Sequence, residues 1–276
     1  MDYRGKVALV TGASSGIGHD LCRCLAERGC QVVAVARREE RLKALLEICQ
    51  QNAPTSSYLA GDLGERDFAE RCVGETLERH GRLDLLVNNA AMPMHKSIYD
   101  LSADEAERVM KVNFLSCVWT TLAAIPAMLK QRGGTIVNVS SMAALVAPPR
   151  ESIYAASKSA MEGFSQGLWN DLAGSGIHVA IVRPGAIDTE IWRKLDEPPA
   201  FRGRKHPARI VSEAVLKAIE KRRFEITVPG RSPSLLAARA LRIFCPALLR
   251  AGLARMDPVP EEVIARARDL GDRPSS

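Results

Sequence analysis

The sequence predicts an α/β protein in which helices cover both faces of a parallel sheet. Short apolar segments alternate with amphipathic helical segments between residues 6 and 230, an order typical of a doubly wound parallel sheet. Small or polar residues follow most of the apolar segments, as expected where parallel strands meet ligand-binding loops. The hydrophobic fraction of 46% and the charged fraction of 25% are ordinary for a globular domain. We therefore predict a three-layer α/β/α domain with seven strands and a helical C-terminal extension.

The first part of the chain, up to residue 90, contains four predicted strands and three predicted helices. Each strand is a short apolar run, and the first, KVALVTG, ends in glycine as a buried parallel strand does before a turn. The helices repeat apolar residues every three or four positions, as Leu42, Leu45 and Cys49 do. In chain order we expect strand 6–12, helix 17–28, strand 31–36, helix 37–51, strand 57–63, helix 65–81 and strand 83–90.

The second part continues the alternation with three more strands. GTIVNVSS and IHVAIVRPG are apolar runs that end in serines and in a Pro-Gly turn, respectively. In chain order we expect helix 102–131, strand 134–141, helix 151–174, strand 177–185, helix 209–222 and strand 224–230. Because no repeat, low-complexity segment or linker interrupts the chain, residues 1–230 are predicted to form one domain, with residues 231–276 as its extension.

The extension begins with RSPSLLAARALRIFCPALLRAGLARM, in which leucines alternate with four arginines. Pro246 is expected to divide this segment into two short helices. A basic amphipathic segment can lie on an anionic membrane surface, and it can equally cover the substrate pocket or pack on a second subunit. We favour a lid or a dimer contact over membrane contact. The remaining residues are expected to form a short solvated helix and a frayed end.

Several classes of protein do not fit the composition. The seven cysteines include no C-x-x-C pair, so neither a disulfide framework nor a metal site is expected. The N-terminal sequence enters a strand without a basic-then-apolar leader, and no uncharged run reaches the roughly 20 residues of a membrane span. The net charge of +6 is modest, the basic residues are scattered and no aromatic platform is visible, so no nucleic-acid partner is expected. We expect cytoplasmic localisation, with residues 231–256 as the segment available for membrane association.

The turn TGASSGIG joins the first strand to the first helix and predicts a phosphate site. Gly12 permits a tight turn. Gly16 and Gly18 would let a ligand approach the backbone at a helix N-terminus, where free N–H groups bind pyrophosphate. The spacing G-x-x-x-G-x-G differs from the G-x-G-x-x-G dinucleotide pattern and from the P-loop. A glycine-rich turn without a ligand is the alternative.

The residues after the second strand indicate which dinucleotide binds. That strand ends AVARREE, so Ala36 stands where NAD-binding folds usually carry an acid for the ribose 2′-OH. Arg37 and Arg38 follow, and guanidinium groups suit a 2′-phosphate as charge-assisted donors. The prediction is NADP(H) in preference to NAD(H). In the alternative, both arginines pair with Glu39 and Glu40.

The sequence YAASK places Tyr154 and Lys158 four residues apart on a predicted helix, and therefore on one face. A free phenol has a pKa of about 10, and a nearby ammonium lowers it by favouring the phenolate. The pair therefore predicts a tyrosine that exchanges protons with a substrate. The spacing alone is a weak signal, and a half-buried Tyr beside a solvated Lys is the alternative.

Several features occur in one order along residues 5–230: TGASSGIG, Asp62, NNAA at 88–91, Asn113, Ser141, Tyr154, Lys158 and PG at 184–185. This set resembles the short-chain dehydrogenase/reductase family, in its compact single-domain branch. Ser141 precedes Tyr154 by thirteen residues, the offset that the family uses. The resemblance implies a Rossmann-like fold and an oxidoreductase that acts on CH–OH donors with NAD(P). Ala91 stands where the family usually has glycine, and the APP at 147–149 stiffens the loop before Tyr154.

The resemblance also implies individual roles. Ser141 would hold the substrate oxygen, Tyr154 would transfer the proton, and Lys158 would also bind the nicotinamide ribose. Asn113 would kink its helix and hold a water in a proton relay to Lys158, whereas Ser140 is expected to be structural. Asp62 and Leu63 would contact the adenine, 89–91 the adenine ribose, and Ile187 and Thr189 the carboxamide. The full predicted cofactor set is Gly12, Ser14, Ser15, Gly16, Ile17, Gly18, Arg37, Arg38, Asp62, Leu63, Asn89, Ala90, Ala91, Tyr154, Lys158, Pro184, Gly185, Ile187 and Thr189.

The predicted pocket walls, residues 92–97, 142–153 and 186–206, are mostly apolar. We therefore expect hydride transfer between NADP(H) and a secondary alcohol/carbonyl pair on an apolar substrate such as a steroid, a retinoid, or a fatty or aromatic ketone. His95 could touch substrate, but a surface position is favoured. The alternatives are a 3-oxoacyl-carrier-protein reductase and an NADP-binding regulator without turnover. A homodimer or a homotetramer is the expected assembly.

Overall fold

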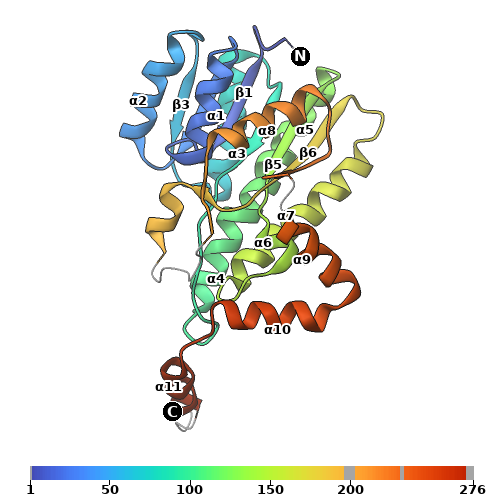
Figure 1. The fold of residues 1–276 in the computed structure, drawn as a ribbon. Coiled ribbons are helices and arrows are strands. Elements are labelled where there is room, and N and C mark those ends of the chain that lie inside the picture. The colour runs from blue at the N-terminus through green and yellow to red at the C-terminus, as the bar shows by residue number, and fades with distance from the viewer. Residues whose placement is uncertain (1, 196–202, 231–232, 272–276) are drawn as a thin grey trace.

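The sheet has the predicted seven parallel strands, with helices on both faces (Figure 1). The structure is a computed structural model that describes residues 2–195, 203–230 and 233–271. The strand order is β3-β2-β1-β4-β5-β6-β9, so the order reverses between β1 and β4. Their bounds are β1 Val7–Thr11, β2 Gln31–Ala36, β3 Ser57–Ala60, β4 Leu85–Asn88, β5 Gly134–Val139, β6 Ile177–Pro184 and β9 Glu225–Val228. The predicted Rossmann-like fold class is therefore confirmed.

Two apolar cores lie on opposite faces of the sheet. Ala8 and Val10 of β1 belong to one core, whereas Val7 and Leu9 belong to the other. This division explains why the strands are apolar throughout, since both faces of a parallel sheet are buried. The main helices are α1 Gly16–Ala26, α2 Glu39–Gln50, α3 Arg66–His80, α4 Ala103–Met110, α5 Ser116–Lys130, α7 Ser152–Asp171 and α8 Arg209–Glu220. α1, α2 and α8 contribute to the first core, and α3 and α5 to the second.

The predicted long helix at 102–131 is interrupted by a π-turn. α4 leads into η1, Lys111–Leu115, and the chain continues as α5. Within the described residues, only this helical run, Ala103–Lys130, is long and apolar enough to cross a membrane. That finding is weak evidence for a span, because core helices meet the same criterion. Ala124 and Met128 of α5 are fully buried against the sheet.

Short elements at the carboxyl ends of β5 and β6 were not predicted. They are α6 Ala143–Val146, the 3-10 turn η2 Glu190–Lys194, and the short strands β7 Ile187–Asp188 and β8 His206–Pro207. Elements of two to five residues are too short to show a hydrophobic period. They build the wall around the cavity described below.

The described part of the C-terminal extension, residues 233–271, forms three helices in the lower half of the molecule as drawn in Figure 1. They are α9 Pro233–Phe244, α10 Pro246–Met256 and α11 Glu261–Gly271. Pro246 begins α10, as expected from its position in the sequence. α9 packs on α6, and the Arg242 guanidinium donates to the carbonyl oxygens of Ala144, at 3.2 Å, and Leu145.

Candidate active site

A cavity of about 520 Å³ opens at the carboxyl edge of the sheet. It runs from the glycine turn after β1 to Ser141 and Tyr154, and so includes the point where the strand order reverses, the usual ligand site of such folds. Every residue of the predicted cofactor set lines it except Gly18. Of the predicted catalytic set, only Asn113 lies outside the lining. The structure thus brings together residues that are far apart in the sequence.

The glycine turn is closely packed against the end of β4. Gly12 has a φ of +69°, and a Cβ atom there would lie 2.8 Å from the Cα atom of Ala90. A Cβ on Gly18 would lie 2.5 Å from the carbonyl oxygen of Gly12. Gly18 therefore lets α1 approach the turn instead of lining the ligand cavity, which corrects the expectation for this glycine. The Asn89 amide holds the same turn by donating to the Thr11 carbonyl at 2.9 Å.

The start of α1 offers a place for a pyrophosphate. Gly16, its first residue, lines the cavity together with Ser14 and Ser15. The first turn of a helix has N–H groups without intrahelical partners, and they attract anions. The residues present therefore fit the phosphate portion of a dinucleotide.

The two arginines after β2 have different surroundings. Arg38 donates to the Ser15 hydroxyl at 2.8 Å and to Glu190 at 2.7 Å, and Arg41 also binds Glu190. These pairs hold the pKa of Glu190 down at about 2. Arg37 is exposed and lines the cavity, and no hydrogen bond or ion pair of its side chain occurs within the described part of the chain.

The alternative in which these arginines pair with the next two residues is not observed. Glu39 and Glu40 instead bind Lys43, at 3.3 and 3.0 Å. Asp62, at the end of β3, is also engaged, because Arg108 binds its carboxylate. Burial would raise the pKa of Asp62, but the Gly64 amide and Arg108 lower it overall.

Tyr154 and Lys158 lie on one face of α7, beside Ser141 at the end of β5. The Ser141 oxygen accepts from the Ala143 amide at 3.1 Å, and its hydroxyl hydrogen-bonds the phenol of Tyr154. Lys158 is only 1% exposed, and its ammonium donates to the Val139 carbonyl at 2.9 Å. The three groups face the same cavity.

Burial controls the protonation of this pair. It raises the pKa of Tyr154 to about 12, although the Ser141 hydrogen bond opposes the shift and Glu151 adds to it. It also lowers the pKa of Lys158 to about 8. The shift of Tyr154 is opposite to the expected one, because desolvation penalises the phenolate more than its surroundings stabilise it. In this structure the phenol is therefore protonated at neutral pH.

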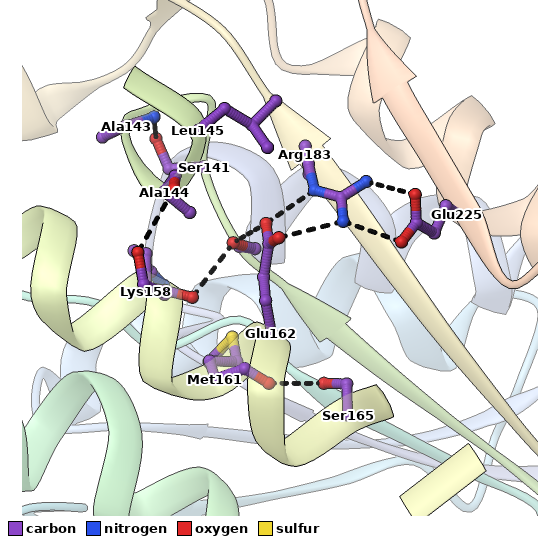
Figure 2. A network of polar contacts seen from close by, with 12 residues as sticks. Ser141, Ala143, Ala144, Leu145, Lys158, Met161, Glu162, Ser165, Arg183 and Glu225 are labelled. Atoms are coloured by element: carbon purple, nitrogen blue, oxygen red, sulfur yellow. Dashed lines mark hydrogen bonds and ion pairs between the residues drawn. The ribbon is translucent and has the colours of Figure 1, made fainter. Parts of the chain in front are cut away.

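A buried ion network fixes α7 behind Lys158 (Figure 2). Glu162, one turn after Lys158, accepts from Arg183 of β6 at 2.6 and 2.9 Å and from the Ser140 hydroxyl at 2.8 Å. Arg183 also donates to Glu225 of β9, at 2.8 and 2.9 Å. Ser140 is therefore part of the supporting network, in keeping with the structural role expected for it.

Asn113 is fully buried in the π-turn. Its side-chain oxygen accepts from the Met92 amide at 2.6 Å, and its side-chain nitrogen donates to the Met92 carbonyl at 3.0 Å. The same nitrogen donates to the Ser157 hydroxyl at 3.1 Å. The expected kink is thus a π-turn, and Asn113 ties the loop after β4 to α7.

The far end of the cavity is mostly apolar. Its walls come from described residues of the three segments expected, and positions 196–202 of the third segment lie outside the described residues. The residues at this end include Met92, Met94, Met142, Val146, Pro148, Ile191, Trp192 and Leu195. Residues 95–97 do not line it. Glu151 is the acid of this end, where burial and then the charge of Asp257 raise its pKa to about 7.

His95 is buried, contrary to the surface position favoured from the sequence. It is 3% exposed, and its Nε2 atom lies 2.9 Å from an Asp257 oxygen in an ion contact that lacks hydrogen-bond geometry. Burial, followed by the charge of Arg150, lowers the pKa of His95. The partner that buries it comes from the C-terminal extension, more than a hundred residues away, which the sequence pattern could not reveal.

Comparisons with known proteins agree with this site. The family model of the short chain dehydrogenases matches residues 6–200. The chain belongs to the short-chain dehydrogenase/reductase family, and it is an oxidoreductase that acts on CH–OH donors with NAD or NADP.

Similar proteins differ in their cofactor and in their length. A relative from Arabidopsis thaliana, 11-beta-hydroxysteroid dehydrogenase 1A, is 41% identical over 68% of this chain and 54% of its own length. The Burkholderia phymatum family member in complex with NAD has a TM-score of 0.81 and 27% identity, over 90% of this chain and 96% of its own. The Sphingobium yanoikuyae dehydrogenase in complex with NADPH has a TM-score of 0.76 and 28% identity, over 92% and 96%.

Proposed function

We propose that this enzyme transfers a hydride between NADP(H) and a secondary alcohol/carbonyl pair on an apolar substrate. The observation that carries the proposal is one continuous cavity. Arg37 and the start of α1 line its cofactor end, Ser141 and Tyr154 lie between, and apolar side chains line the far end. This arrangement matches a charged dinucleotide followed by an apolar substrate.

The preference for NADP(H) rests on the charge after β2. Ala36 supplies no carboxylate for a ribose 2′-OH, and Arg37 is exposed in the cavity. Its charge acts on the Asp62 carboxylate, but its side chain forms no hydrogen bond or ion pair in the described part of the chain. A 2′-phosphate would give that guanidinium a charge-assisted partner. Arg38 is committed to Glu190 and the serine hydroxyls, so it would contribute mainly by shaping the turn. The NADPH complex of the Sphingobium protein supports this choice, and the NAD complex of the Burkholderia protein represents the rival.

The proton transfer is assigned to Tyr154. When bound, the nicotinamide would supply or accept the hydride. Because the phenol of the half-buried Tyr154 is protonated at neutral pH, it can donate to a carbonyl oxygen in the reducing direction. Ser141 can hold the same oxygen through its hydroxyl, which already contacts the phenol.

Lys158 and Asn113 would act around this pair. The Lys158 ammonium is held at the Val139 carbonyl, within the lining, where it can bind a ribose hydroxyl and balance negative charge on Tyr154. Asn113 holds the loop at Met92 and is assigned the water relay to Lys158. Residues 1–230 would form the catalytic domain and residues 231–276 its extension.

The substrate is assigned to the steroid, retinoid or fatty-ketone class. Methionine, proline and tryptophan side chains dominate the far end of the cavity, which favours burial of an apolar body. The name of the Arabidopsis relative points to a steroid. A 3-oxoacyl-carrier-protein reductase is the rival enzyme, and the intact Ser141, Tyr154 and Lys158 disfavour a regulator without turnover.

A homodimer is the proposed assembly, in the cytoplasm. Large apolar side chains are exposed on α5 and α7, with Leu122 at 57%, Leu129 at 46% and Trp169 at 51%. Exposed apolar surface of this kind marks protein contacts.

The proposal is tested by kcat/KM with NADPH and NADH over a panel of steroid, retinoid and aromatic ketones, aldehydes and acyl thioesters. NADPH with an apolar ketone is expected to give the highest value. Arg37→Ala should weaken NADPH about 10- to 100-fold and leave NADH nearly unchanged, because a hydrogen bond to a charged group contributes about 1.5–3 kcal/mol. Lys43→Ala, on the exposed face of α2, is the matched control. A preference for NADH or for acyl thioesters would refute the assignment.

A further inference from the structure

The end of α9 and the following helix α10 expose several large apolar side chains. Ile243 is 72% exposed, Phe244 79%, Leu248 63% and Met256 64%. Ile243 and Phe244 are the most exposed large apolar side chains of the described chain. Leu249 and Leu253, one turn apart on α10, are half-buried. We call residues 240–256 the tail surface.

The same segment is strongly basic. Residues 240–256 contain Arg242, Arg250 and Arg255 and no aspartate or glutamate. They contribute a charge of +3 to the net charge of +6. Arg242, Arg250 and Arg255 are exposed. A partner that covers the tail surface must therefore be apolar in part and negatively charged in part.

These requirements argue against a second copy as the partner. In a two-fold symmetric contact the same patch meets itself, so arginines would face arginines without any acid of the segment to separate them. Like charges brought together in this way oppose association. An anionic lipid bilayer supplies both negative headgroups and an apolar interior.

Two anchors hold the tail surface in one position beside the cavity. Arg242 binds the carbonyl oxygens of Ala144 and Leu145 in α6, and α6 lines the cavity through Ala143 and Val146. At the other end, Asp257 contacts His95 at 2.9 Å and Arg150 at 3.5 Å. The surface is thus attached to α6, which lines the cavity, and to the loops around residues 95 and 150.

We propose that the tail surface docks on an anionic lipid bilayer, and that the enzyme takes its apolar substrate from that bilayer. The second half of the proposal rests on the proposed function. Docking itself does not, because it depends only on the apolar and basic side chains of α9 and α10. An experiment that measures binding and turnover separately can therefore distinguish failure of the one from failure of the other.

The first experiment is flotation of the full-length protein with vesicles of phosphatidylcholine alone or with about 30% phosphatidylglycerol. We expect co-flotation with the anionic vesicles only, and its loss at high salt, since salt screens surface charge. The double variant Phe244→Ser, Leu248→Ser should bind at least tenfold more weakly. Arg250→Gln with Arg255→Gln should lose about fivefold for each arginine, the factor that corresponds to about 1 kcal/mol per basic residue. Ile48→Ser, which removes a 40% exposed side chain from α2, is the matched control and should bind as the wild type does.

A second readout uses Cys245, which is exposed while the other six cysteines are buried. The emission of an environment-sensitive fluorophore on its thiol should shift to shorter wavelength when anionic vesicles are added.

Turnover tests the uptake of substrate from the bilayer. All variants should keep wild-type turnover of a water-soluble ketone without vesicles, and turnover of a bilayer-dissolved ketone should fall for the double variant. Docking is overturned if the wild type does not float with anionic vesicles, if the double variant floats equally well, or if Phe244 and Leu248 are instead required for a dimer. If docking occurs but the double variant turns over the bilayer-dissolved ketone normally, uptake from the bilayer is overturned and docking stands.

Discussion

At the scale of single residues, burial decides the protonation of the two groups that share one face of α7. The pKa of Tyr154 is raised to about 12 and that of Lys158 is lowered to about 8, so neither shift comes from attraction between the two. A positive charge on a bound oxidised nicotinamide would favour the phenolate. A protonated Tyr154 therefore suits carbonyl reduction. Alcohol oxidation needs the phenolate, which the positive charge of the oxidised cofactor would favour.

Tyr154→Phe tests this assignment. The variant keeps the ring and the packing but removes the proton donor, so kcat should fall about 10²- to 10⁴-fold, the usual contribution of general acid catalysis. NADPH binding, measured by quenching of protein fluorescence, should be retained. Tyr99→Phe, at an exposed tyrosine, is the control. A Tyr154→Phe enzyme with most of its activity would contradict the role of the phenol.

Glu151 should make stability depend on pH. Its folded-state pKa of about 7 lies above its ordinary value of 4.5, so the folded state binds this proton more tightly. The stability that the proton contributes is present below pH 4.5 and is lost as pH rises through about 7. Glu151→Gln removes this dependence. Relative to the wild type, the free energy of unfolding of the variant should rise by about 3 kcal/mol between acidic and alkaline pH.

The measurement is urea unfolding of both proteins at several pH values across that window. Arg150, His95 and Asp257 lie around the same loop, so each of them stays unchanged in the comparison. A constant difference in the free energy of unfolding between variant and wild type would mean that Glu151 titrates normally.

Sequence patterns identified residues whose roles depend on local spacing. Tyr154 and Lys158 share a helix face because they are four positions apart, and the glycine turn is recognisable because it joins a strand to a helix. The pairing of Arg38 with Glu190 was not predictable, because 152 residues separate the two. The raised pKa of Glu151 likewise depends on burial and then on the charge of Asp257, both of which arise only in the folded chain.

At the scale of elements, the strands and long helices were predictable and the short elements were not. Apolar runs predicted all seven strands of the main sheet, though the predicted 57–63 strand ends at Ala60. The segments α6 and η2 were missed because one turn of helix has no period. The π-turn at Lys111–Leu115 was expected only as a kink at Asn113, and that expectation came from the resemblance to the family.

The ion network of Figure 2 connects α7 to β6 and β9. Glu162→Gln should therefore lower the free energy of unfolding. The side chain of Arg183 is 3% exposed and that of Glu162 is 11% exposed. Removing one partner of a buried pair leaves an uncompensated charge and costs about 3–5 kcal/mol. Because Arg183 keeps Glu225, we expect the lower part of this range in urea unfolding at neutral pH.

Glu70→Gln, at an exposed pair with Arg66, is the control and should cost less than about 1 kcal/mol. If Glu162→Gln cost no more than this control, α7 would be held by apolar packing. Its catalytic residues would then be positioned without the network.

At the scale of the whole molecule, the C-terminal extension is joined to the domain by a few polar contacts. Asp257 meets His95 and Arg150, Arg242 meets α6, and Arg266 meets Asp100 at 2.7 Å. α10 has no buried residue, so apolar burial contributes little there. The sequence pattern predicted that this extension is helical. Its position beside the substrate end of the cavity could not be predicted, because it depends on contacts between residues far apart in the sequence.

Asp257→Asn should therefore detach the extension without unfolding the domain. The side chains of Asp257, His95 and Arg150 are 17%, 1% and 7% exposed, so loss of the carboxylate leaves a buried guanidinium less compensated. The cost of about 3 kcal/mol for such a loss corresponds to roughly 100-fold faster amide hydrogen exchange. The increase should be confined to residues 246–271 and the loops around 95 and 150.

The control is Asp100→Asn, which removes the exposed pair with Arg266 and should change amide hydrogen exchange only slightly. Unchanged exchange in Asp257→Asn would mean that apolar contacts hold the extension, and faster exchange throughout the sheet would mean that the extension and the domain unfold as one unit.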